Sequence, residues 1–234
     1  MPLRCLSTVI SLLLAAMYPA PVSAELPPPP ALPAVLLQGA IPPASAGELA
    51  ATLRALGYSG LLFEGLLPAL GEQEATPEDH AWQHEEALRE ALPALEANGL
   101  ARNYLAVELA PDARYFAEDH LQARAVAQTA RSGEHCRAAG NLGMALDTRQ
   151  HAFHYDFRWD GYDLFDPPPP LLEARAAACA TALLRAFWTA APESPVLLLC
   201  EDPVRAGPLW WAFFNGSVEA LGAAGELRLE LVLT

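Results

Sequence analysis

The sequence alternates short apolar runs with longer segments whose apolar residues recur at helical spacing, and this alternation constrains the fold most strongly. Strands that are apolar along their whole length are typical of parallel sheets with helices packed on them. The repeat therefore indicates an α/β protein built from successive β-α units. The expected strands are residues 34–39, 60–64, 103–109, 142–147, 195–200 and 226–232, and the expected helices are residues 46–56, 80–98, 118–139, 171–190 and 208–223.

Two α/β architectures fit this order of elements. An open, doubly wound sheet usually carries a glycine-rich phosphate loop after its first strand. Here residues 40–43 read Ala-Ile-Pro-Pro, so that signal is absent. We therefore predict a parallel (β/α) barrel of TIM type, apparently incomplete because about six strands are visible where eight are needed. An open six-stranded parallel sheet is the alternative, and in either case open strand edges could pair with another copy.

The N-terminus indicates export. Arg4 precedes an apolar stretch over 6–17, and Val22-Ser23-Ala24 offers small residues for a signal peptidase, so we expect a signal peptide over 1–24 that is cut after Ala24. Residues 25–33 are a proline-rich spacer, and residues 34–234 form the barrel-like domain, which is truncated if two β-α units are missing. The mature protein is expected to be secreted or periplasmic, with no membrane association.

Charge and lysine content exclude several functions. The formal net charge is −14, and loss of Arg4 with the signal peptide gives −15, so nucleic acids and anionic lipid surfaces are not expected partners. All 14 basic residues are arginine. Without lysine there is no Schiff-base, pyridoxal-phosphate or Walker-type phosphate lysine. We predict no cofactor.

The cysteines and a tryptophan cluster are expected to be structural. Cys136, Cys179 and Cys200 lie in apolar stretches, so three buried free thiols are favoured over one bridge and a leftover thiol. The aromatic residues of segment 210–214 are expected to pack in the core rather than to hold a ligand.

Two local motifs also give expectations. Ser45, with Glu48 three residues later, is expected to cap the first helix. His84-Glu85-Glu86 lacks the second histidine of a zinc-binding HExxH motif, so it is expected to form a solvated helix face.

Carboxylates follow successive predicted strands. In barrels, functional side chains lie at the carboxyl ends of strands and in the loops that follow. The first strand ends near Gln38, and acids then stand at the ends of the next four, where Glu64, Glu108, Asp147 and the pair Glu201-Asp202 are found. This arrangement favours a polar site at the mouth of the barrel.

The segment 147–163 is the richest in functional side chains. Its aromatic rings could stack on sugar rings, while its acids and arginines could bind hydroxyl groups, so it suits a carbohydrate ligand. Packing of these aromatics over the barrel mouth is the alternative. The expected substrate-binding residues are Glu64, Arg149, His151, His154, Tyr155, Asp156, Trp159 and Asp202.

Residues 143–148 (GMALDT) and 155–157 (YDF) carry a family resemblance. Over about residues 100–225 the chain resembles uncharacterised secreted bacterial (β/α)8-barrel proteins described as glycoside hydrolases. The resemblance implies a barrel fold and activity on carbohydrates. These relatives have glutamate two residues after the strand-end aspartate, whereas this chain has Arg149. If that glutamate is catalytic in the relatives, the chain lacks it.

Three functions therefore remain open. Glycoside hydrolysis requires two carboxyl groups, and we predict Asp147 with Glu108 or Glu201 as the pair, without assigning acid and base. A catalytically inactive sugar-binding barrel is the second possibility. A metal-dependent hydrolase using His151 and His154 is the third, although we predict no metal site because the HxxHxD spacing is a weak signal.

Overall fold

The structure is a computed structural model that describes residues 36–71, 81–109, 114, 116–140, 142–149, 166–200, 206–224 and 229–233. The expected signal peptide and spacer lie outside these residues and stay predictions. Along the chain the elements are β1 (Leu36–Gly39), α1 (Pro43–Ala55), β2 (Gly60–Phe63), α2 (Ala81–Ala97), β3 (Tyr104–Glu108), α3 (Asp119–Ala138), β4 (Gly143–Asp147), α4 (Pro169–Ala190), β5 (Val196–Cys200), α5 (Pro208–Ala224) and β6 (Leu229–Leu233).

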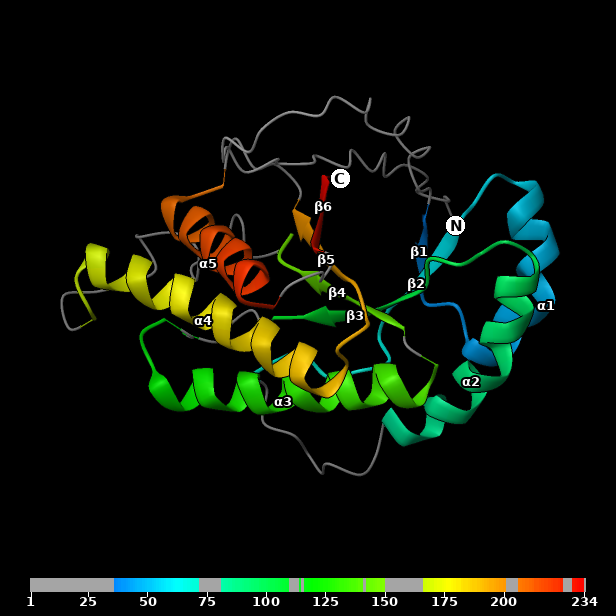
Figure 1. Cartoon of the computed structure of the whole chain (residues 1–234), viewed down its shortest axis with the longest axis horizontal. Coiled ribbons are helices and arrows are strands. Elements are labelled where there is room, and N and C mark those ends of the chain that lie inside the picture. The colour runs from blue at the N-terminus through cyan, green and yellow to red at the C-terminus, as the bar shows by residue number, and fades with distance from the viewer. Residues whose placement is uncertain are drawn as a thin grey trace, which may run out of the picture.

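The six strands form one parallel sheet in the order β1-β2-β3-β4-β5-β6. A doubly wound sheet reverses its strand order at a switch point, whereas a barrel adds each strand beside the previous one. Figure 1 shows the sheet curled, with the helices arranged around its convex side. The prediction of an incomplete TIM-type barrel is therefore confirmed, and the strand order excludes a doubly wound sheet. The outermost strands of the described sheet are β1 and β6, and self-association through them stays a prediction.

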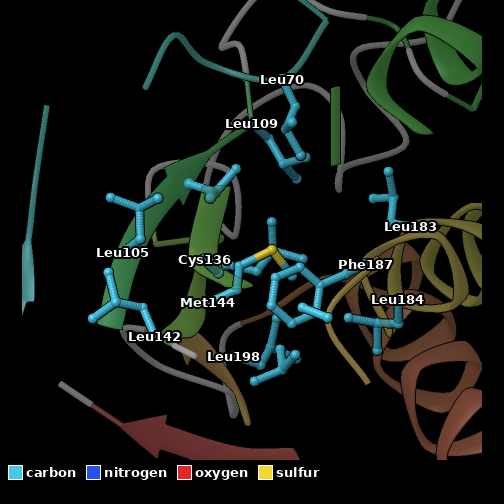
Figure 2. Close-up of a cluster of buried hydrophobic side chains, with 14 of the residues drawn as sticks. Leu70, Leu105, Leu109, Cys136, Leu142, Met144, Leu183, Leu184, Phe187 and Leu198 are labelled. Carbon is cyan, nitrogen blue, oxygen red and sulfur yellow. The ribbon is translucent and has the colours of Figure 1, made fainter. Parts of the chain in front are cut away.

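The main hydrophobic core fills the layer between the convex side of the sheet and the helices. Leu105, Met144 and Leu198 face this layer from neighbouring strands, and Phe187 of α4 packs against them (Figure 2). A smaller cluster lies on the concave face and consists of Leu62, Tyr104, Ala106, Ala145, Leu197 and Leu199, with Leu36 partly buried against it. Alternation of side chains along each strand produces these two layers.

Glycines allow the helices of the outer layer to approach closely. A Cβ at Gly133 of α3 would lie 2.8 Å from the carbonyl oxygen of Phe187, and one at Gly216 would lie 2.0 Å from that of Ala177. Because these contacts leave no room for a side chain, α3, α4 and α5 pack backbone to backbone.

Two local expectations are wrong. Helix α1 begins at Pro43 after Pro42, with no side-chain cap, because proline at the first helical positions is already set to helical φ. Ser45 therefore lies inside the helix. The expected solvated face is wrong for Glu85 alone: Glu86 is exposed and His84 partly buried, whereas Glu85 is buried with its carboxylate 2.5 Å from Nη2 of Arg89 and 3.7 Å from Nδ1 of His135.

The structural role of the cysteines is confirmed, and core packing of the aromatic cluster is confirmed for Trp210 and Phe213 but not for Trp211. Cys136, Cys179 and Cys200 are all buried, and none of the three forms a disulfide within the described part of the chain. Trp210 and Phe213 are fully buried, while Trp211 is 43% exposed at the surface of α5. Among the described helices, none is both long and apolar enough to cross a membrane.

The buried thiols are expected to be unreactive in the folded protein. Burial raises the pKa of Cys136 and of Cys179 to about 12. At pH 8 about one molecule in ten thousand would then carry the reactive thiolate at either position. Treatment with iodoacetamide, followed by peptide mass spectrometry, should leave all three cysteines unmodified in the native protein and label them in guanidinium chloride. Rapid labelling of native Cys136 would contradict this packing.

Candidate functional site

The concave face becomes polar toward the carboxyl ends of the strands. Leu36, Leu62, Ala106 and Ala145 belong to the concave-face cluster. Because side chains alternate along a strand, the residue two positions further on projects to the same face. The four residues reached in this way are Gln38, Glu64, Glu108 and Asp147. The predicted gathering of strand-end side chains therefore has a simple cause in the strand periodicity.

These side chains line an open cavity of about 450 Å³. Its lining consists of Gln38, Ala40, Glu64, Gly65, Glu108, Asp147 and Arg149. Gly65 has a φ of +70°, a left-handed conformation that lets the chain turn directly after Glu64. The volume lies within the range that small-molecule sites usually have.

Asp147 is held by Arg149. The backbone N–H of Arg149 donates to Oδ1 of Asp147 at 2.9 Å, which is the local turn that aspartate commonly forms with the residue two positions on. The guanidinium then donates from Nε to Oδ1 at 2.9 Å and from Nη2 to Oδ2 at 2.5 Å. Both carboxylate oxygens of Asp147 are thus engaged, and the residue is only 6% exposed.

Arg149 also reaches the first two strands. Its Nη1 donates to Oε1 of Gln38 at 2.8 Å, and its Nη2 lies 3.5 Å from Oε1 of Glu64. Gln38 in turn donates from Nε2 to the same oxygen of Glu64 at 2.5 Å. We call Gln38, Glu64, Asp147 and Arg149 the Arg149 cluster.

The charges of the cluster stabilise the guanidinium. Burial lowers the pKa of Arg149, but hydrogen bonding and attraction to Asp147, followed by attraction to Glu64, raise it, and the net pKa is above its ordinary value. Arg149 is therefore a permanent cation whose hydrogen bonds are directed at the wall of the cavity.

Glu108 occupies a different environment from Asp147. The two residues are register partners at the ends of β3 and β4, so they are neighbours on the concave face. Glu108 is exposed, whereas Asp147 is buried. Glu108 is consequently a carboxylate of the cavity that solvent and ligands can reach.

The residue between Asp147 and Arg149 anchors this segment to the core. The Thr148 hydroxyl donates to the carbonyl oxygen of Leu199 at 2.7 Å and accepts from Nε1 of Trp210 at 3.0 Å. Both side chains are fully buried. The hydrogen bonds of Thr148 to β5 and α5 therefore hold the turn that orients Arg149.

The structure brings together four of the predicted site residues, Glu64, Glu108, Asp147 and Arg149, in one cavity. Its lining also includes Gln38, Ala40 and Gly65, which the list of expected substrate-binding residues did not contain. The alternation of the first strand could have identified Gln38 as a lining residue. The remaining predicted residues lie outside the described part of the chain, namely Glu201, Asp202, His151, His154, Tyr155, Asp156 and Trp159.

Among the described residues, no group of three or more histidine, cysteine, aspartate or glutamate side chains is arranged to hold a metal ion. The alternative based on His151 and His154 falls outside these residues and stays a prediction.

Known proteins resemble this chain only distantly. No model of a protein family matches the chain, and no curated protein matches it. Among solved structures, the chain is similar to an endoglucanase with 10% sequence identity and a TM-score of 0.43. The match covers 79% of this chain and 51% of the endoglucanase chain, so the chain spans about half the length of that structure. This distant likeness carries no argument about activity.

Proposed function

We propose that the chain binds a carbohydrate in the cavity on the concave face of the sheet, without cleaving it through Asp147. The observation that carries the proposal is the cavity itself, which combines the exposed carboxylate of Glu108 and the partly exposed carboxylate of Glu64 with an amide and a guanidinium. Carboxylates accept hydrogen bonds from hydroxyl groups, and a ring of such acceptors suits a polyhydroxylated ligand. The aromatic residues of segment 150–163 would add stacking surfaces if that loop covers the cavity.

The state of Asp147 favours binding over hydrolysis. A glycosidase needs one protonated carboxyl group to donate to the leaving oxygen and a second to attack or to activate water. Arg149 donates to both oxygens of Asp147, and Asp147 is only 6% exposed, so this carboxylate is directed at the arginine rather than at a ligand in the cavity. If hydrolysis occurs, we infer that Glu108 performs it with Glu64 or Glu201.

The charge of the lining favours neutral or amine-bearing sugars. The described lining contains the three carboxylates of Glu64, Glu108 and Asp147 and the guanidinium of Arg149, a formal charge of −2. Such a wall repels uronic acids and sugar phosphates. We also propose that the protein is exported, because residues 1–24 have the three parts of a signal peptide.

A screen of neutral, amino and acidic oligosaccharides should find binding to neutral or amine-bearing members and no release of reducing ends. The full mature chain would be tested for binding by calorimetry and for turnover with aryl glycosides, beside Asp147→Asn. Turnover that Asp147→Asn abolishes would overturn the binding-only proposal and restore the hydrolase. Activity that requires added zinc would instead support the metal-dependent alternative, and the absence of any glycan binding would contradict the function altogether.

A further inference from the structure

Among the neighbouring strands, β2 and β3 pair over the fewest positions, and we call their boundary the short junction. β3 and β4 pair over five positions, and β4 and β5 over four, whereas β2 and β3 pair at two, Leu62 with Tyr104 and Phe63 with Leu105. Near the amino ends of β2 and β3 the junction is reinforced, because Oδ1 of Asn103 accepts from the backbone N–H of Leu61 at 3.1 Å. The first two strands are thus joined to the rest of the sheet at few positions, and beyond β2 the chain adds one bridge between Leu70 and Leu109.

At the cavity end, the Arg149 cluster crosses this junction. Arg149 follows β4, and its guanidinium contacts Asp147 of β4 together with Gln38 of β1 and Glu64 directly after β2. Along the sheet, β1 and β4 are three strand spacings apart, about 14 Å. One side chain can reach both ends only because the sheet is curled, so these contacts link the strands across the concave side.

β1 has few other attachments. It is four residues long, it is an edge of the described sheet, and all four residues are only partly buried. Its backbone pairs with β2 alone among the described strands. Beyond this pairing, Gln38 holds the strand at the cavity through two hydrogen bonds to charged groups, one accepted from Arg149 and one donated to Glu64.

We propose that Arg149 is a positioning residue that holds the β1-β2 pair against the β3-β4 pair at the cavity end and so sets the width of the cavity. Without it, the two pairs separate at the short junction and the cavity widens. The role does not depend on which ligand the cavity binds. It requires the planar guanidinium, because a lysine ammonium cannot form paired bonds to Asp147 and reach Gln38 at once.

Hydrogen–deuterium exchange of the full chain tests this role without a ligand. In Arg149→Met, the amides of 36–39 and 60–63 should exchange about tenfold faster, the effect of losing hydrogen bonds to a charged group. The amides of 196–200 in β5 should be unchanged, and Arg149→Lys should behave as Arg149→Met does. Arg175→Met is the matched control, since Arg175 is a partly buried arginine that pairs with Asp119 in the helical layer.

A second variant covers the case in which Arg149→Met unfolds. Gln38→Leu removes the β1 end of the link, together with the hydrogen bond from Gln38 to Glu64, and leaves the pair of Asp147 and Arg149 intact. It should accelerate exchange in 36–39 while 143–147 stays protected. Unchanged exchange of 36–39 in Gln38→Leu, or an equal acceleration there in Arg175→Met, would overturn the proposal.

Discussion

Replacing Trp210 with alanine is expected to lower the free energy of unfolding by about 3–5 kcal/mol, as is usual when a large buried aromatic side chain is removed. Trp210 is fully buried, stacks on Phe214 with ring centroids 5.5 Å apart, and donates to Thr148. The variant therefore loses buried apolar surface and the hydrogen bond to Thr148, which holds the turn that orients Arg149. Urea unfolding monitored by far-ultraviolet circular dichroism measures the change, because this signal comes from the backbone and not from the replaced tryptophan.

Trp211→Ala is the matched control for Trp210. Trp211 is the next residue of the same helix, has the same side chain and is 43% exposed. Its replacement should cost about 1 kcal/mol or less, because a partly solvated side chain loses less burial. Equal losses for the two variants would show that Trp210 is not the buried anchor described above.

Replacing Asp147 with alanine should cost about 3 kcal/mol, because it removes the main counter-ion of a largely buried guanidinium. The side chain of Asp147 is 6% exposed and that of Arg149 is 19% exposed, so the arginine left behind is poorly solvated. Thermal or urea unfolding of wild type and variant at one pH measures the difference. The expected loss exceeds the value of an exposed ion pair several-fold.

Asp119→Ala provides the comparison for Asp147. Asp119 also pairs with an arginine, Arg175, but its side chain is 83% exposed. Exposed pairs contribute about 0–1 kcal/mol, so this variant should be nearly as stable as wild type. If Asp147→Ala lowered the free energy of unfolding as little as Asp119→Ala does, Asp147 would not be the buried partner that fixes Arg149. Its carboxylate would then be available for catalysis.

Much of the fold could be predicted because it depends on patterns that repeat along the chain. Continuous apolar runs such as 196–200 fix the strands, and residues such as Gly57, Gly99 and Gly140 mark where helices end. Helix starts were less predictable. The potential of Ser45 to cap is visible in the sequence, but the two prolines before it begin the helix earlier.

The candidate site could be predicted only in part. The strand period places Glu64, Glu108 and Asp147 on one face, which needs no knowledge of tertiary contacts. The pairing of Gln38 with Arg149 spans 111 positions and depends on how strongly the sheet curls, which no local pattern encodes. Burial of Glu85 by α3 is a tertiary effect of the same kind.

The role of Arg149 is the point at which structure changes the functional interpretation most. In the sequence it appears as a substrate-binding residue that stands where a catalytic glutamate would be expected. In the structure its donors are directed at Asp147 and Gln38, and its Nη2 also lies 3.5 Å from Glu64. The acceptors that a ligand can reach are therefore exposed Glu108 and the exposed quarter of the Glu64 side chain, and the proposed carbohydrate binding depends on these two residues.

Calorimetric titration of the best-binding neutral oligosaccharide into wild type and Glu64→Gln tests that claim most directly. Loss of the charged acceptor should weaken binding about tenfold or more, as for other hydrogen bonds to charged groups. Glu193→Gln is the control, because Glu193 is an exposed glutamate in the turn before β5, at the opposite end of the sheet. Weakened binding is expected for Glu64→Gln alone. Equal dissociation constants for wild type and both variants would contradict it, because the sugar would then bind elsewhere.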